Sequence, residues 1–414
     1  MRIPTLFLLG CAGFVSTLSM RLCDAMLPAL ASTFSTTTAQ AASVVTALAI
    51  AYGALQFVAG PLGDRYGKPR VIALACLWCG AATAAAALAT SLSALTLARF
   101  ATGAGSAAIV PLVLAWIGDT VTSERRYEAL ARYSTATIMG TLLGAWAGGA
   151  LTQWLGWRAA FAIVAPLFVL AGVALLANPA RAGSSGDASL PRDRTPYLTA
   201  VRDLLGRAWV RRVYGVVLLE GLLVFGALTF VPSLMHDRFD LPLAMGGAVV
   251  AAYGLGGLLY SRLAPRLMKR LHPRALARAG AVLMAGGLGL IALMVSPAAT
   301  AVACAMLGLG FFAMHNTLQF QATTLSPHRR GLALSFFAAS LFFGQSMGVP
   351  LAGWTLTHAH PSWTYGGAAL ALVVLGWVYT RMWARHAAAT ESAAPQATPA
   401  APPAPAAPGP TTDR

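Results

Sequence analysis

Charged residues are scarce in this chain of 414 amino acids. They make up 10% of the sequence, whereas hydrophobic residues make up 57%. A soluble domain of ordinary composition carries about 25% charged residues. The chain therefore lacks the polar surface that would keep so apolar a core in water, which excludes an ordinary soluble enzyme.

Cysteines are also few. All five lie within apolar runs, so no disulfide framework is predicted. Cys76 and Cys79 form a C-x-x-C pair that lacks a second pair of ligands, which argues against a metal or redox site. We therefore expect neither a metal nor a cofactor.

The sequence contains few acids and is strongly basic. Lys and Arg number 29 against 13 Asp and Glu, for a net charge of +16. A basic excess is typical of proteins that bind nucleic acid or a membrane. Here the cations stand in short clusters between apolar runs of about 20 residues, the length that crosses a bilayer core. This pattern favours a lipid bilayer and argues against a nucleic-acid partner.

Apolar runs and helix breakers predict an all-α membrane protein with twelve transmembrane helices. The expected spans are 4–30, 41–62, 70–90, 93–118, 127–152, 157–177, 211–235, 241–263, 273–295, 298–325, 329–357 and 362–384. The connections after Thr90 and Val295 are too short for extramembrane domains, so the spans form packed hairpins.

The first run has an alternative interpretation as a secretory signal peptide. Arg2 supplies a charged start, and the stretch 29–31 resembles a cleavage site. However, the run is longer than a usual signal region, and Arg21 and Asp24 interrupt it. These features favour a first membrane span.

The cations predict the orientation. If the chain starts inside, the cytoplasmic ends and loops hold 23 of the 29 cations, Arg414 in the tail is a further one, and the outer loops hold only Arg158 and Arg238. This asymmetry is the positive-inside pattern. We expect a multi-pass protein of the cytoplasmic (inner) membrane with both termini in the cytoplasm.

The chain divides into two halves that repeat each other. Residues 1–178 form an N-terminal six-helix bundle, 179–210 a cytoplasmic linker, and 211–386 a C-terminal six-helix bundle. The tail 387–414 is rich in Ala and Pro, which predicts disorder. At an offset of 204 residues, four residues of the fifth span match the eleventh: Arg126, Gly140, Gly144 and Gly149 fall on Arg330, Gly344, Gly348 and Gly353. At an offset of 197, Gly60 and Arg65 match Gly257 and Arg262. We predict a duplicated six-helix unit.

The connection between the second and third spans is a tight turn with one acid and three bases. Its notable residues are Gly60, Asp64, Arg65, Gly67, Lys68 and Arg70. This stretch resembles the signature loop of the major facilitator superfamily. The resemblance implies a twelve-helix transporter with an inner gate, in which Asp64 and Arg65 make contacts that break when the transporter changes its facing. Gly60 and Gly67 would permit close packing, and Ser261 would replace the acid in a weaker second-half gate.

Three further stretches resemble the twelve-helix proton-coupled drug antiporters of that superfamily. They are the run Asp24–Leu30 at the end of the first helix, Arg99 with Gly103 and Gly105 in the fourth, and a glycine motif in the fifth formed by Gly140, Gly144, Gly148 and Gly149. Thr102 replaces a common Gln of the group, and Ala145 replaces its usual Pro. The resemblance implies antiport, although the missing Pro departs from the fifth-helix motif.

Ionisable residues inside the membrane are functional candidates, because each costs about 2.5–3.5 kcal/mol to insert. The expected spans contain Arg21, Asp24, Arg99, Arg132, Glu220 and His315. At 1.5 Å per residue, Asp24 and Arg99 both lie about 9 Å below the outer ends of their helices. We predict that they pair, with Arg21 as the competing partner of Asp24. The pair is either a proton-coupling device or a permanent salt bridge that orients two helices.

The second half holds a single acid within its expected spans. Glu220 is predicted near the middle of the membrane, either to bind a cation or proton or to stay protonated within the bundle. His315 and Gln319 share one helix face beside Asn316, and Tyr52 and Gln56 repeat this spacing in the second span. These residues line a cavity or serve helix packing.

The sequence therefore predicts a monomeric secondary transporter for small molecules and protons. Proton-coupled efflux of small amphipathic compounds is our first hypothesis, and proton-coupled uptake of a sugar, organic acid or similar solute is the alternative. A membrane sensor is disfavoured because no soluble signalling domain is present. A polytopic enzyme is disfavoured because the chain contains no metal-binding His motif, nucleotide loop or nucleophile motif.

Overall fold

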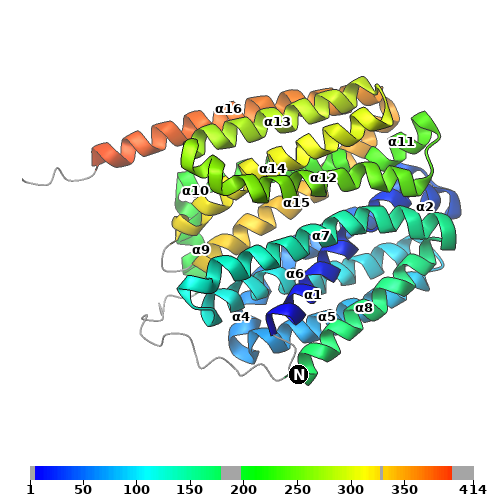
Figure 1. Ribbon diagram of the computed structural model, residues 1–414, viewed down its shortest axis with the longest axis horizontal. Helices are drawn as coiled ribbons and strands as arrows, with labels where there is room; N and C mark the ends of the chain where they lie inside the picture. Colours follow the sequence, from blue (N-terminus) through cyan, green and yellow to red (C-terminus); the bar gives the residue numbers. More distant parts are fainter. Residues whose placement is uncertain (1–4, 179–196, 327–329, 394–414) are drawn as a thin grey trace, which may run out of the picture.

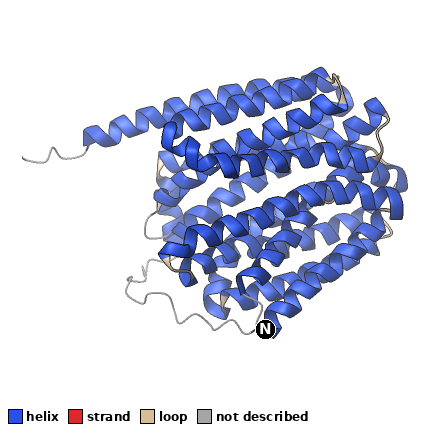
Figure 2. Cartoon of the chain, viewed as in Figure 1, coloured by secondary structure: helices blue, strands red, loops and turns tan. Residues whose placement is uncertain are grey.

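The protein is helical throughout the residues that the computed structural model describes, 5–178, 197–326 and 330–393. These ranges contain no strand (Figure 2). Eleven helical segments in them are long and apolar enough to cross a membrane. The all-α membrane architecture expected from the sequence is confirmed.

The long helices lie roughly side by side in one bundle (Figure 1). The first half consists of α1 Thr5–Arg21, η1 Asp24–Met26, α2 Leu27–Thr33, α3 Thr38–Ala41, α4 Ser43–Tyr66, α5 Lys68–Ala87, α6 Leu92–Thr120, α7 Ser123–Leu155 and α8 Trp157–Ala177. The second half consists of α9 Tyr197–Gly206, α10 Ala208–Leu228, α11 Val231–Phe239, α12 Leu243–Arg270, α13 Pro273–Leu293, α14 Pro297–Leu325, α15 Arg330–His358 and α16 Pro361–Ala393.

Two names for the ends of the bundle are used below. The Asp64 end is where α4 meets α5, and the Gly156 end is where α7 meets α8. The positive-inside pattern predicts that the Asp64 end faces the cytoplasm. Each half has its own apolar core, but residues cross over: Phe230, Val349 and Ala352 belong to the core of the first half. Ala145 belongs to that of the second.

Helix α7 is the expected span that falls short of the apolar threshold for a membrane helix. Its first turns carry Arg125, Arg126, Glu128 and Arg132, and the rest of the helix is rich in Gly, Thr and Ser, so its mean hydropathy is low. The helix is nevertheless central, because it packs against α1 of its own half and against α12 of the other.

The first span is broken, although the sequence predicted it as continuous. Pro28 lacks an N–H, and its ring would clash with the carbonyl four residues earlier in a regular helix. The chain therefore leaves α1 at Arg21 and resumes in α2. Pro232 lies 204 residues later and accompanies the matching break between α10 and α11.

Glycines join the same helices in each half. A methyl group at Gly144 of α7 would overlap the carbonyl of Leu18 in α1, and one at Gly348 of α15 would overlap the carbonyl of Leu222 in α10. Both members of the second pair lie 204 residues after those of the first. The repeat is therefore a repeat of contacts as well as of residues.

The same offset relates two contacts between the halves. Gly149 of α7 meets the backbone of Leu243 at the start of α12, and Gly353 of α15 meets Ala39 of α3. Exchanging the halves converts one contact into the other. Both lie at the Gly156 end, where Gln153 Oε1 also accepts a hydrogen bond from the N–H of Ala244 at 3.0 Å.

The expected match at offset 197 is not the structural one. Helix α4 ends at Tyr66 and α12 ends at Arg270, which are 204 residues apart. Pro61 and Pro265 inside these helices keep the same offset. Gly257 and Arg262 are therefore about two turns away from the counterparts of Gly60 and Arg65, and Ser261 does not take the place of Asp64.

Helical structure extends beyond the expected spans at two places. Within the predicted linker, Tyr197–Gly206 forms α9, whose Leu204 is buried. Helix α16 has 33 residues and projects past its neighbours at the Asp64 end (Figure 1). The first seven residues of the predicted tail belong to it, because the alanines near 387–389 favour a helix until Pro395 approaches. Residues 394–414 lie outside the described ranges.

Candidate functional site

The break in the first span creates a buried polar centre. A helix leaves its last carbonyl groups without partners in the helix, and α1 ends in the protein interior. Asp24 opens the short helix η1 immediately beyond, and its side chain is completely buried. Donors from other residues therefore have to satisfy both the carbonyls of α1 and the carboxylate.

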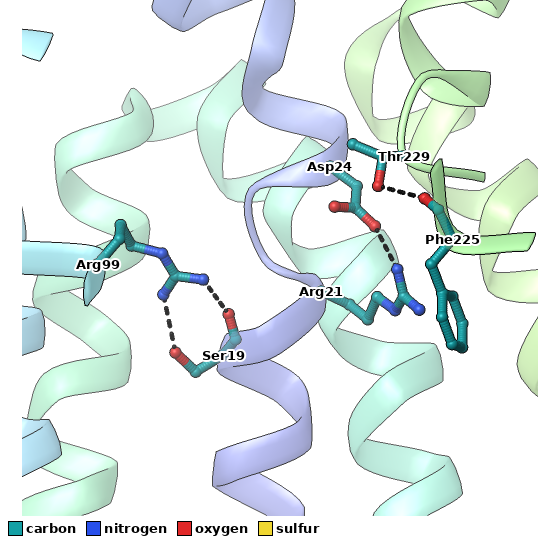
Figure 3. A network of polar contacts seen from close by, with 6 residues as sticks. All are labelled: Ser19, Arg21, Asp24, Arg99, Phe225 and Thr229. Atoms are coloured by element: carbon teal, nitrogen blue, oxygen red, sulfur yellow. Dashed lines mark hydrogen bonds and ion pairs between the residues drawn. The ribbon is translucent and has the colours of Figure 1, made fainter. Parts of the chain in front are cut away.

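Arg99 of α6 satisfies the end of α1 (Figure 3). Its guanidinium donates to the carbonyl oxygen of Ser19 at 2.9 Å and to the Ser19 hydroxyl at 3.1 Å. The positive charge also lies at the negative end of the helix dipole, where a cation is stabilised. Arg99 is fully buried, so it is fixed as a structural cap of α1.

Asp24 pairs with Arg21 instead. Arg21 Nη1 lies 3.2 Å from Asp24 Oδ2, and no ion pair joins Asp24 to Arg99. The predicted Asp24–Arg99 pair is therefore wrong, and the competing partner takes the carboxylate. Arg99 does reach the first span, but the break in that span exposes carbonyl groups that a continuous helix would have satisfied.

Arg21 also contacts the other half. Its guanidinium carbon lies 4.3 Å from the ring centroid of Phe225 in α10 (Figure 3). The α10 backbone is held at this point by Thr229, whose hydroxyl donates to the Phe225 carbonyl at 2.8 Å. One guanidinium therefore connects the carboxylate of the first half with an aromatic ring of the second.

A second buried pair lies in the other half. Glu220 of α10 is fully buried, and its Oε2 lies 2.8 Å from Nδ1 of His315 in α14. The His315 ring stacks on Phe311 at 4.7 Å and contacts Phe337 at 4.9 Å. The two residues were separate candidates in the sequence. Their depth was an available signal for the pair, since Glu220 and His315 each lie about 15–18 Å from the Asp64 end of their helices.

An aromatic cluster lies between the two pairs. Phe225 and Phe311 have ring centroids 5.1 Å apart, and Tyr253 of α12 lies within 6.2 Å of both. Phe225 contacts Arg21, and Phe311 stacks on His315. A continuous path of side-chain contacts thus runs from Asp24 in the first half to Glu220 in the second.

Several buried polar atoms in this region have no hydrogen-bond partner. They include Asp24 Oδ1, Glu220 Oε1 and the Tyr253 hydroxyl. An unsatisfied buried polar atom costs about 1–3 kcal/mol. Such atoms in one region have the chemistry required to accept a proton or a hydrogen-bonding ligand.

The other polar candidates occupy different places. The Tyr52 ring lies against the Phe342 ring of α15, with 3.9 Å between the ring centroids, which places Tyr52 in the seam between the halves. Gln56 is buried, and its Oε1 has no partner. Asn316 lies beside the Tyr260 hydroxyl of α12, and Gln319 is half-buried. Tyr52 therefore contacts an aromatic residue of the opposite half.

The gate motif forms an ion-pair cluster around Lys68. Lys68 Nζ lies 3.0 Å from Asp64 Oδ1 and 2.7 Å from Asp119 Oδ2 at the end of α6. The cluster therefore ties together α4, α5 and α6 of the first half. Asp119 is not among the predicted gate residues, although its place directly after the fourth span could have suggested it.

The remaining motif residues differ in role. Gly67 has φ +88° and needs glycine for that backbone conformation. A methyl group at Gly63 would overlap Leu112, whereas Gly60 has open space around it. Gly63 is therefore the glycine that permits close packing. Gly60 and Gly67, which were expected to do so, have open space around them. The Arg65 guanidinium lies over the Tyr66 ring at 5.2 Å, and Arg70 is exposed.

Two further candidates can be placed. The four glycines of the fifth-helix motif lie on α7, where Gly140, Gly144 and Gly148 hold it against α1. The helix runs without interruption through Ala145. Arg132 has a largely exposed side chain that pairs with Glu128 at 2.6 Å. It is therefore a surface residue near the Asp64 end, and not a buried charge.

Comparisons with known proteins agree with this architecture. The family model of the Major Facilitator Superfamily matches residues 9–329. A solved bacterial homologue of the human lysosomal transporter Spinster, in an inward-facing and unoccupied conformation, has a TM-score of 0.71 at 16% identity. The alignment covers 91% of this chain and 95% of that one.

Several curated relatives are resistance proteins. The lincomycin resistance protein of Streptomyces lincolnensis is 29% identical over 60% of this chain, and the match spans 47% of the relative's own length. The puromycin resistance protein pur8 of Streptomyces alboniger is 27% identical, over 74% of this chain and 72% of the relative. The chloramphenicol resistance protein of Streptomyces lividans is 28% identical, over 72% and 80% respectively.

Proposed function

Because this chain belongs to the Major Facilitator Superfamily, we propose that it exports small amphipathic compounds in exchange for protons. Membership makes it a multi-pass membrane transporter and not an enzyme. The relatives are named for resistance to lincomycin, puromycin and chloramphenicol, which supports efflux as the direction. The positive-inside pattern supports an inner-membrane location with both termini in the cytoplasm.

The Arg21–Asp24 pair is the observation that carries this proposal. Both side chains are buried, and Arg21 also lies against Phe225 of the other half. Protonation of Asp24 removes the charge that holds Arg21, so the guanidinium loses its ionic partner. The contact between the Arg21 guanidinium and the Phe225 ring of the other half then changes as well. Proton binding at one residue thereby acts on the seam along which the halves move in alternating access.

The substrate is proposed to bind at the aromatic cluster formed by Phe225, Tyr253 and Phe311. These rings offer an apolar surface, and the Tyr253 hydroxyl and Glu220 Oε1 are polar atoms without partners. A mostly apolar site with a few polar groups suits an amphipathic compound. Asp24 and Glu220 flank the cluster, so proton and substrate act on neighbouring groups.

The Lys68 cluster is proposed to serve as the gate at the Asp64 end. Lys68 holds Asp64 and Asp119 together within the first half. Rearrangement of this cluster would accompany closure of that end. The packed contacts at the Gly156 end would then have to separate.

Everted membrane vesicles with an acidified lumen test the function. Adding puromycin, lincomycin or chloramphenicol should alkalinise the lumen, because each compound that enters is exchanged for protons. Asp24→Asn should abolish this response at unchanged protein level. Asp240→Asn is the matched control: Asp240 is exposed and has φ 51°, which Asn tolerates, so its variant should respond normally.

The other outcomes discriminate between the hypotheses. Further acidification of the lumen on adding a compound would identify symport. A full response from Asp24→Asn would reject Asp24 as the coupling residue. Absence of any response across a broad compound panel would reject export of such compounds.

A further inference from the structure

A pocket outside the central site lies at the Asp64 end of the second half. It has a volume of about 530 Å³ and is formed by residues of α10, α14 and α16, together with Arg207 just before α10. It is separate from the Arg21–Asp24 and Glu220–His315 pairs, which contribute none of its lining residues. A ligand in this pocket would therefore not contact the two buried pairs of the transport site.

The pocket combines positive charge with an apolar surface. Arg207 and Arg212 line it, and neither forms an ion pair within the described part of the chain. Trp209 and His386 form one wall, with their rings stacked at 4.4 Å. Val210 and Leu325 contribute buried apolar side chains. Such a lining suits a ligand with an anionic group beside a hydrocarbon portion.

The backbone adds to the positive potential. Helix α10 has 21 residues and begins at Ala208 inside the pocket, without a side-chain cap at Arg207. The first N–H groups of a helix have no partners within it and attract anions. Arg211 is already engaged, since its Nη1 donates to the carbonyls of Leu205 and Gly206. Arg207 and Arg212 thus remain as the charged groups available to a ligand.

A long stretch of the second half lacks acids altogether. The sequence contains no Asp or Glu from residue 241 to 390, yet this stretch contains ten Lys and Arg. In the first half, by contrast, Asp64, Asp119 and Glu128 each pair with a cation at the same end. The cations of this stretch therefore have no acid within it to pair with.

We propose that this pocket binds the phosphate head group of an anionic phospholipid. Arg207, Arg212 and the start of α10 hold the phosphate. Trp209 suits the interface between head groups and acyl chains, where Trp is enriched. Basic pockets between membrane helices are suited to such head groups. In the expected orientation, the pocket faces the cytoplasmic leaflet, whose surface is negatively charged.

Native mass spectrometry of the detergent-purified, full-length protein tests this site. Cardiolipin or phosphatidylglycerol should remain bound, whereas phosphatidylethanolamine should not compete. The double variant R207Q/R212Q should lose at least about tenfold in affinity for the anionic lipids, since each basic residue near an anionic surface contributes a substantial share of the binding. The control R266Q/R270Q removes the same charge from the same half outside the pocket and should lose less than about twofold.

A second variant separates shape from charge. Thr324→Trp keeps every cation but fills the pocket, so it should also weaken lipid binding if the protein elutes as a single species in gel filtration. Equal losses in R207Q/R212Q and R266Q/R270Q would show a diffuse charge effect and overturn the proposal. So would unchanged binding in Thr324→Trp, or displacement of the lipid by inorganic phosphate alone, which would indicate a small-anion site. None of these readouts depends on transport activity.

Discussion

Arg21 and Phe225 occupy equivalent positions in the two halves, 204 residues apart, and they contact each other. The guanidinium carbon lies 4.3 Å from the ring centroid. Equivalent residues can meet only close to the axis that relates the halves. The Arg21–Asp24 pair therefore lies near this axis, where a local change in charge acts on both halves.

Removing the cation should destabilise the protein more than removing the pair. Arg21→Met leaves Asp24 buried without its partner, and we expect the free energy of unfolding to fall by about 3–5 kcal/mol. The double variant Arg21→Met/Asp24→Asn should recover most of this loss. Thermal unfolding in detergent measures both values. Additive losses would mean that the two side chains are not coupled.

Glu220 should discriminate between charged and uncharged compounds. Glu220→Gln keeps the shape and the hydrogen bond to His315 but removes the negative charge. Export of a cationic compound such as puromycin should fall about tenfold or more, because a buried cation left without its partner costs about 3–5 kcal/mol, and about 1.4 kcal/mol corresponds to tenfold. Export of uncharged chloramphenicol should change little. Initial rates in proteoliposomes give the comparison, and equal losses for both compounds would exclude a charge-selective role.

Asp119 should contribute as much to transport as Asp64, the acid of the predicted gate motif. Asp119→Asn and Asp64→Asn each remove one of the two carboxylates bound to Lys68, and we expect transport to fall severalfold in both. Lys68→Arg should preserve activity, whereas Lys68→Met should match the double acid variant. Glu128→Gln is the control, since Glu128 forms an exposed pair outside the cluster. A normal transport rate in Asp119→Asn would show that Asp119 is not part of the gate.

The glycine contacts should be equally sensitive in the two halves. Gly144→Ala and Gly348→Ala both push a methyl group into a neighbouring backbone, and each should cost about 1–3 kcal/mol. Gly118→Ala and Gly289→Ala lie in helices with open space around them and should be neutral or gain about 0.5–1 kcal/mol. Melting temperatures of the four variants test this. A stable Gly348→Ala beside an unstable Gly144→Ala would contradict equivalent packing.

The sequence predicts the helices more completely than the contacts between them. Length and hydropathy are local properties, so the spans and the repeat at offset 204 could be read directly. The pairing of Asp24 required knowledge of the break before Pro28, because that break exposes the Ser19 carbonyl and diverts Arg99. Pro28 and Pro232 together were an available signal for it.

Other features depended on geometry that no spacing encodes. Lys68 reaches Asp119 across 51 positions, and this contact follows only from the packing of α5 against α6. The match at offset 197 rested on residue identity alone and failed once the ends of α4 and α12 set the register. Helix α9 was missed because ten residues of mixed character do not form a membrane span.

The paired contacts at the Gly156 end have a mechanical consequence. Gly149 against Leu243 and Gly353 against Ala39 are two copies of one joint on opposite sides of the axis that relates the halves. A symmetrical rocking of the halves would strain both contacts equally. Neither contact could then stay closed as a hinge while the other opens. If the halves rock in this way, the two contacts have to open together for this end of the bundle to open.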